Sequence, residues 1–164
     1  VGSGPIRAHA PLILDIFPRE TATGYFADMT RTVVRGRASA RVREMYAAVE
    51  AAQEFAFERI RGGADAQAVH RGILELFTDA GFPTGAVNGR MQGFFHGTGH
   101  GVGLDIHEPP SFGARPSTLP EGAVVIVEPG LYYPGVGGVR LEDMVLVTAS
   151  GCRNLTRAAK VLED

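Results

Sequence analysis

Four acidic residues stand inside or at the ends of apolar stretches, in two similar places of the chain. Asp15 lies in Leu-Ile-Leu-Asp-Ile and Glu128 lies in Val-Ile-Val-Glu-Pro. Each is followed by a second acid, Asp28 after 13 residues and Glu142 after 14. An ionised carboxylate in a buried strand costs several kcal/mol unless a cation compensates it. We interpret the two segments as a weak internal repeat of two hairpins that each carry a carboxylate pair.

Pairing of the strands in each hairpin would bring Asp15 beside Asp28 and Glu128 beside Glu142. Repulsion between like charges then adds to the cost of burial and favours protonation of the acids. Two divalent cations would neutralise the four carboxylates and make their burial tolerable. The alternative is that each acid caps a turn or pairs with a distant arginine, which suits a single acid better than the repeated set.

Three of the five histidines fall within the glycine-rich segment His96-Gly-Thr-Gly-His100-Gly-Val-Gly-Leu-Asp-Ile-His107. Glycines allow a backbone and a ligand to approach closely, and a histidine in such a loop can bind a metal ion or transfer a proton. The alternative is a surface loop with incidental histidines. We expect such a structural role for the isolated His9 and His70, and a functional one for the cluster.

Composition limits the classes of function. The chain has 164 residues, which suffices for a single domain with a proper core over residues 1–164. A formal charge of −2 and a pI near 6.2 predict neither a nucleic-acid partner nor a membrane surface, and no apolar stretch approaches the ~18 residues of a membrane span. One cysteine, Cys152, excludes an internal disulfide and a cysteine-rich zinc site. With no export signal visible, we expect the protein in the cytoplasm.

Apolar runs predict two pairs of strands around the acids. The first pair covers residues 11–17 and 25–34, and the second covers 124–127 and 139–147, joined by the turn-rich residues 134–138. With two helices between the hairpins, the order predicts an α+β fold.

Two helices are expected between the hairpins. Ser39 is the N-cap of the first, which Gly62-Gly63 ends, and Asp65 is the N-cap of the second, which Gly81 ends. The apolar face of the first carries Val42, Met45, Tyr46, Val49, Ala52, Ala56 and Ile60, and that of the second carries Val69, Ile73, Leu76, Phe77 and Ala80. We expect residues 84–104 to be mostly loop, with a short strand at Phe94-Phe95.

The motifs as a set resemble those of the pita-bread metallopeptidase family, which includes methionine aminopeptidases, Xaa-Pro aminopeptidases and prolidases. The resemblance runs from Leu12 to about Leu155, and the Asp-to-Asp hairpin, Gly-His-Gly-x-Gly, Val-Glu-Pro-Gly and Arg-x-Glu-Asp follow the order of the family. It implies a pita-bread (creatinase/aminopeptidase-like) fold of two similar hairpin halves with covering helices. Because the family's domain is longer at the N-terminus, we expect an N-terminally truncated domain with an exposed apolar surface. A homo-oligomer or association with the missing N-terminal portion would cover that surface.

The resemblance also implies a site for two divalent metal ions. Its ligands would be Asp15, Asp28, His100, Glu128 and Glu142, with Asp28 and Glu142 bridging the ions. His100 and Glu128 would complete one ion, and Asp15 the other. Oxygen-rich ligation with one histidine favours Mn²⁺, with Co²⁺, Fe²⁺ or Zn²⁺ as alternatives.

Within the family, His96, Arg140 and the segment Leu-Asp-Ile-His-Glu-Pro resemble the proline-specific branch. This implies an exopeptidase that hydrolyses the peptide bond before proline in short Xaa-Pro peptides, through a hydroxide that bridges the ions. Glu128 would accept the proton of the water. His96 and His107 would bind the substrate and stabilise the tetrahedral intermediate, and Arg140 would order the site or bind the substrate carboxylate.

Other functions stay open on the same residues. They are a methionine-aminopeptidase-type exopeptidase, a catalytically silent peptide-binding module, a metal-free hydrolase of the creatinase kind and a glycoside hydrolase with paired carboxylates. Five filled ligand positions disfavour the silent binding module and the metal-free hydrolase. The Gly-His-Gly segment disfavours the glycoside hydrolase, which would leave it unexplained. The spacing from Asp15 to Asp28 is two residues longer than is usual in the family. We place the extra pair in the turn at 19–24, where it leaves the inward-facing side chains unchanged.

Overall fold

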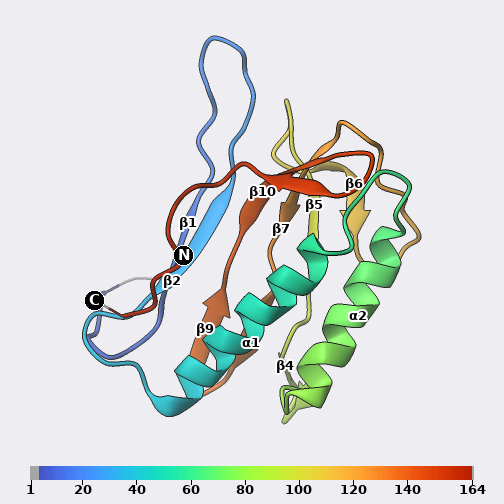
Figure 1. Ribbon diagram of the computed structural model, residues 1–164. Helices are drawn as coiled ribbons and strands as arrows, with labels where there is room; N and C mark the ends of the chain where they lie inside the picture. The colour runs from blue at the N-terminus through green and yellow to red at the C-terminus, as the bar shows by residue number, and fades with distance from the viewer. Residues whose placement is uncertain (1–3, 164) are drawn as a thin grey trace.

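Two helices cover one face of a five-stranded antiparallel sheet, and a two-stranded ribbon lies at the side of that sheet (Figure 1). The computed structural model describes residues 4–163. The sheet has the order β11-β10-β7-β5-β6, with β5 at Gly99–Gly101, β6 at Glu108–Phe112, β7 at Val124–Val127, β10 at Asp143–Val147 and β11 at Cys152–Asn154. The arrangement confirms the expected α+β class.

The first predicted hairpin is the ribbon of β1 (Leu12–Ile16) and β2 (Met29–Val33). Both strands are shorter than predicted, because residues 17–28 leave the ladder and form a loop that protrudes from the molecule (Figure 1). Asp15 is paired with Thr30, so Asp28, two residues before Thr30, lies on the same face of the ribbon as Asp15. A bridge between Thr30 and Glu142 joins the ribbon to the second hairpin.

The second hairpin is longer than predicted and is interrupted on both sides. Strand β7 pairs with β10, while β8 (Gly130–Tyr133) pairs with β9 (Gly137–Arg140) as a separate ladder. The predicted strand at 139–147 is therefore wrong as a single element, because the ladder breaks at Leu141 and Glu142. Asp143 pairs with Val127, and this register brings Glu128 and Glu142 to the same end of the β7–β10 pair.

The two helices are capped as the sequence predicts. Helix α1 (Ala40–Phe57) begins after Ser39, whose hydroxyl accepts from the Val42 N–H at 3.3 Å. Helix α2 (Ala66–Asp79) begins after Asp65, whose carboxylate accepts from the Gln67 N–H at 2.9 Å. All seven apolar positions predicted for the first helical face are buried, although Ile60 lies beyond the end of α1.

The apolar face predicted for the second helix is partly wrong. Val69, Ile73 and Phe77 are buried and Leu76 is half-buried, but Ala80 is exposed because the helix ends before it. Residues 84–104 also hold more strand than expected, namely β3 (Gly85–Val87), β4 (Arg90–Gln92) and β5. Phe94-Phe95 is not a strand, and the buried ring of Phe94 packs in the core.

Strand β1 exposes the apolar surface that the sequence predicts. Leu14 and Ile16 are 46% and 53% exposed, on the face opposite Asp15. Among the described residues no strand pairs with the outer edge of β1.

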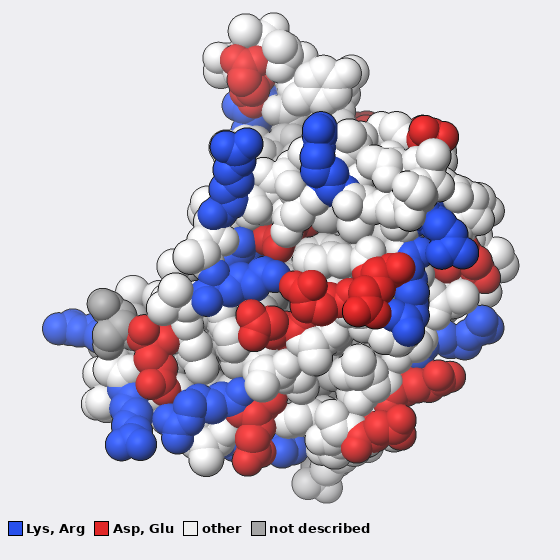
Figure 2. All heavy atoms as spheres, in the orientation of Figure 1, with Lys and Arg blue, Asp and Glu red and all other residues white. Residues whose placement is uncertain are grey.

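Figure 2 shows basic and acidic side chains interspersed on the face drawn, so this face has no broad basic surface. None of the described helices is both long enough and apolar enough to cross a membrane.

Candidate metal centre

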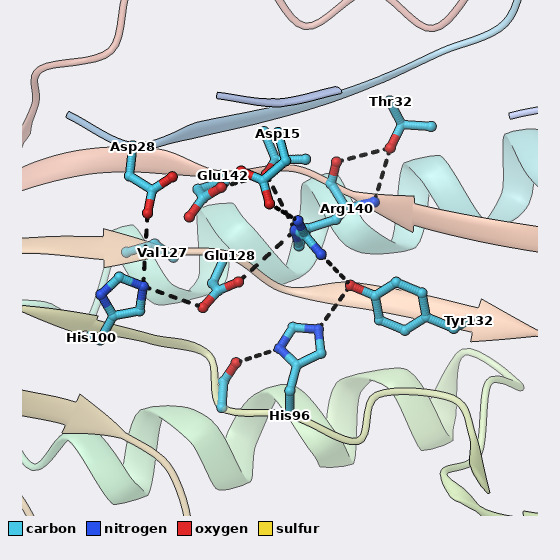
Figure 3. A network of polar contacts seen from close by, with 12 residues as sticks. Asp15, Asp28, Thr32, His96, His100, Val127, Glu128, Tyr132, Arg140 and Glu142 are labelled. Atoms are coloured by element: carbon cyan, nitrogen blue, oxygen red, sulfur yellow. Dashed lines mark hydrogen bonds and ion pairs between the residues drawn. The ribbon is translucent and has the colours of Figure 1, made fainter. Parts of the chain in front are cut away.

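Five predicted metal ligands from five separate places in the chain line one pocket of about 160 Å³. Asp28 immediately precedes β2, His100 is the middle residue of β5, Glu128 follows β7 and Glu142 lies between β9 and β10. Asp15 lies in β1 on the same side (Figure 3). Phe17, Ile106 and His107 complete the lining.

Three of these side chains form the tightest group. Ligand atoms of Asp28, His100 and Glu142 all lie within 4.8 Å of one another. The His100 Nε2 atom lies 4.0 Å from Asp28 Oδ2 and 3.7 Å from Glu128 Oε1. Asp28 Oδ1 is buried and has no hydrogen-bond partner among the described residues. A buried oxygen without a donor, beside two more carboxylates and an imidazole, suits a hard divalent cation.

The glycines around His100 are required by the approach of neighbouring strands. A Cβ atom at Gly99 would lie 1.8 Å from the carbonyl oxygen of Ile126 in β7, and one at Gly101 would lie 2.4 Å from that of Pro109 in β6. The His100 Nδ1–H donates to the Gly101 carbonyl at 3.0 Å. This hydrogen bond fixes the tautomer and leaves Nε2 free to face the carboxylates.

Burial and like charge disfavour the ionised form of three acids. Burial, with repulsion from neighbouring carboxylates, raises the pKa of Glu142 to about 8 and that of Asp28 to about 6. Burial raises the pKa of Glu128 to about 7 even though Arg140 opposes the shift. A divalent cation would stabilise all three carboxylates. The donor set and its electrostatics therefore fit the metal ions that the sequence predicts.

Among these acids Asp15 makes the shortest contact with a cationic side chain, although Arg140 Nε also lies 3.9 Å from Glu128 Oε2. Arg140 Nη2 donates to Asp15 Oδ2 at 2.5 Å, and the Asp15 side chain is 38% exposed. The two residues are distant in sequence and meet where β1 lies beside β9. The distant-arginine alternative is therefore correct for Asp15, and Glu128 shares the same arginine at longer range.

Tyr132 and Thr30 belong to the site, and sequence reasoning missed both. The His96 Nδ1–H donates to the Gly97 carbonyl at 2.8 Å, so its Nε2 accepts from the Tyr132 hydroxyl at 2.9 Å (Figure 3). The Tyr132 oxygen in turn accepts from Arg140 Nη1 at 3.2 Å. The Thr30 hydroxyl donates to a Glu142 carboxylate oxygen in a short hydrogen bond and accepts from Arg140 Nε at 3.2 Å.

A period of two along each strand could have revealed these residues. Thr30 lies two positions after Asp28, and Tyr132 lies four positions after Glu128.

The isolated histidines have the structural roles that we predicted. His70 Nδ1 lies 2.9 Å from the Thr98 hydroxyl, and His9 Nδ1 lies 3.1 Å from the backbone N–H of Arg37.

The remaining predicted residue, His107, lies at the pocket beside the histidine of the tight group. The ring centroids of His100 and His107 are 4.3 Å apart. The structure thus gathers every predicted site residue, with His96 joined through Tyr132. Of the five predicted metal ligands, Asp15 and Glu128 lie outside the tightest three-ligand group.

The sequence matches metallopeptidase family M24 over residues 2–149, and the chain therefore belongs to that family. The expected pita-bread fold is confirmed by solved structures of the same family. Membership is in accord with the carboxylate and histidine set described above.

The relatives include proteins of the proline-specific branch. The chain is 39% identical over 139 residues to the Xaa-Pro dipeptidase of Pyrococcus furiosus, covering 84% of this chain and 38% of that protein. A crystal structure of a dipeptidase from Pyrococcus horikoshii OT3 matches with a TM-score of 0.86 and 39% identity, over 99% of this chain and 43% of that one. A crystal structure of an X-Pro aminopeptidase from Thermotoga maritima MSB8 matches with a TM-score of 0.85 and 31% identity, over 96% and 42%. The chain thus spans about two fifths of the length of these relatives.

Proposed function

We propose that the protein is a metallo-exopeptidase that uses two divalent ions to hydrolyse the peptide bond before proline in short Xaa-Pro peptides. The observation that carries this proposal is the group formed by the buried Asp28 and Glu142 with the half-buried His100, with Asp15 and Glu128 lining the same pocket. The names of the relatives, Xaa-Pro dipeptidase and X-Pro aminopeptidase, support the substrate class.

The ligands are proposed to divide between the two ions. Asp28 and Glu142 would serve both ions, His100 and Glu128 would hold one, and Asp15 would hold the other. Mn²⁺ is the proposed metal, with Co²⁺, Fe²⁺ or Zn²⁺ as alternatives. When bound, the ions supply a hydroxide nucleophile at neutral pH and polarise the scissile carbonyl.

The side chains around the ligands have separate proposed roles. Glu128 accepts the proton of the attacking water, and His107 donates to the developing oxyanion from its position beside His100. Burial lowers the pKa of His96, so this histidine is neutral and accepts the hydrogen bond of Tyr132 on one side of the site. Arg140 fixes Asp15 and contributes to substrate binding.

A wider groove supports a peptide as the bound partner. It has a volume of about 790 Å³, begins at His100, His107 and Glu128, and continues along residues 108–117. A peptide whose scissile bond lies at the acids could leave the site along this groove. We further propose the cytoplasm as the location, and a second copy or further polypeptide as the cover of the exposed strand β1.

Peptide hydrolysis tests the proposal directly. The Mn²⁺-loaded protein is expected to release the first residue from Leu-Pro and Leu-Pro-Gly, and excess chelator is expected to abolish the reaction. His107→Ala should retain the metal but lose roughly 10²–10³ in kcat, the usual effect of removing one oxyanion donor. Glu128→Gln removes the proposed proton acceptor and should lower kcat. Glu121→Gln, at an exposed glutamate, is its matched control.

Three outcomes would replace the proposal. Release of methionine from Met-Ala-Ser without cleavage before proline would favour the methionine-aminopeptidase type. Peptide binding without cleavage by the metal-loaded protein would favour a silent binding module. Hydrolysis that survives complete removal of metal would favour a metal-free hydrolase.

A further inference from the structure

Arg31 is a buried arginine outside the pocket, and each of its five N–H groups has an acceptor. It is 7% exposed. Nη1 donates to the carbonyl oxygens of Thr30 at 2.9 Å and Glu142 at 2.8 Å. Nη2 donates to Asp143 Oδ1 at 2.7 Å and to the Ala158 carbonyl at 2.8 Å. Nε donates to the Ala159 carbonyl at 3.2 Å, so the guanidinium uses its full donor capacity.

These acceptors come from three segments that are distant in sequence. They are β2, residues 142–143 where β10 begins, and the C-terminal segment 155–163. In Figure 1 this segment, in red, returns from the top of the sheet to lie beside β2. The Val34 N–H donates to the Leu162 carbonyl at 2.6 Å, which fastens the far end of the segment to the end of the ribbon.

Asp143 holds the same segment from the other side. Its Oδ2 atom accepts from Asn154 Nδ2 at 2.9 Å and lies 3.4 Å from Lys160 Nζ. Lys160 Nζ also lies 3.6 Å from Glu54 in α1. The charge of Arg31 is thus matched by Asp143 within a buried cluster, and not by an acid of the pocket.

Glu142 depends on this cluster because it lies where the ladder is interrupted. Its backbone N–H donates to the Thr30 carbonyl at 3.1 Å, and its carbonyl accepts from Arg31. Its carboxylate accepts from the Thr30 hydroxyl. Arg31 and Thr30 therefore determine both where the Glu142 backbone lies and where its carboxylate points.

We propose that Arg31 and residues 155–163 form a C-terminal strap that positions Glu142 for metal binding. The inference rests on the proposed metal site but goes beyond its ligands. Arg31 is a positioning residue that acts through the Glu142 backbone. The strap supplies acceptors for two of its five N–H groups, the carbonyls of Ala158 and Ala159. Loss of the planar fork should displace Glu142 and weaken the metal complex.

Co²⁺ titration of the purified protein, followed by the visible spectrum of the bound ion, tests the strap. Arg31→Met is expected to weaken Co²⁺ binding by about 10- to 100-fold, as removal of the groups that support metal ligands usually does, and to alter the spectrum. Arg31→Lys keeps the charge but not the fork, so it should resemble Arg31→Met. Arg153→Met, at an exposed arginine of β11, is the matched control and should bind Co²⁺ normally.

A milder variant covers the case in which Arg31→Met does not fold. Lys160→Met leaves Arg31 in place but loosens the strap at Asp143, and we expect a severalfold weaker Co²⁺ affinity with an unchanged circular dichroism spectrum. Normal affinity and spectrum in every folded variant of Arg31 and Lys160 would overturn the inference alone. Failure of the unaltered protein to bind Co²⁺ would instead overturn the proposed metal site, and the strap with it.

Discussion

The two hairpins carry similar acid pairs in the sequence, but they place them in different surroundings. Glu142 is 3% exposed, in a hairpin whose strands β7 and β10 lie inside the five-stranded sheet. The Asp15 side chain is 38% exposed, on a ribbon whose outer strand has no further strand beside it among the described residues. The second hairpin is therefore held by the core, whereas the first places Asp15 at the margin of the molecule and Asp28, 6% exposed, beside the buried acids.

The difference shows how each half compensates its charge. Burial raises the pKa values of Glu128 and Glu142, so the second hairpin needs an added cation to keep both acids ionised. Asp15 instead has a cation within the chain, because Arg140 reaches it from the second hairpin. Arg140 is thus one of the side chains that link the two halves, together with Thr30 and Arg31.

The largest expected effect comes from removing an acid of the buried half. Glu142→Ala should lose both ions, since the proposed bridging position serves each of them, whereas Asp15→Ala should retain one. Elemental analysis of each variant after Mn²⁺ loading and desalting measures the difference. Loss of the same number of manganese ions from both variants would contradict the difference between the two halves. Loss of only one ion from Glu142→Ala would overturn its bridging role.

Removing the link between the halves should affect catalysis more than metal content. Arg140→Ala frees Asp15 and leaves the Tyr132 oxygen with one partner fewer, so we expect about two ions per chain but kcat/KM for Xaa-Pro peptides lowered by roughly 10- to 100-fold. Steady-state kinetics on several peptides checks this, with Arg90→Ala at an exposed arginine as control. Unchanged kinetics across the peptides would remove Arg140 from the site.

Tyr132→Phe should have a smaller effect of the same kind. It deletes one hydroxyl that donates to His96 and accepts from Arg140, a change of about 1–1.5 kcal/mol for a typical hydrogen bond, or about tenfold in rate. Tyr133→Phe is a close control, because its hydroxyl donates to the Pro83 carbonyl away from the pocket. Equal slowing of hydrolysis in both variants would mean that the Tyr132 hydroxyl contributes no more to the rate than a hydroxyl away from the pocket.

The smallest effect concerns the stability of the metal-free protein. The raised pKa values of Glu128 and Glu142, about 7 and about 8, mean that the folded protein binds protons that the unfolded chain has already lost. Stability should therefore fall as the pH rises from 6.5 to 8.5, by a few degrees in Tm, and Mn²⁺ should reverse the trend. Thermal unfolding in chelator tests this. Glu142→Gln should flatten the profile, and a profile unchanged by that variant would contradict the assignment.

Local signals predicted the helices and the acid and histidine clusters, and the family resemblance implied the ligand set, while long-range contacts account for what was missed. Ser39 and Asp65 could be identified as N-caps because capping depends on neighbouring residues. Strands β3 and β4 within 84–104 pair with each other, but each has only three residues and is too short to show a periodicity, whereas β5 pairs with β6 and β7 outside that segment. The pairing of Arg140 with Asp15 spans 125 residues and follows only from the placement of β1 beside β9.

Metal content of the purified chain tests the central claim most directly. After Mn²⁺ is added and the protein is desalted, elemental analysis should find close to two ions per chain. Asp28→Ala should lose them, because this variant removes a proposed bridging ligand from the tightest group. Absence of bound manganese in the unaltered protein, or the same manganese content in Asp28→Ala, would contradict the account.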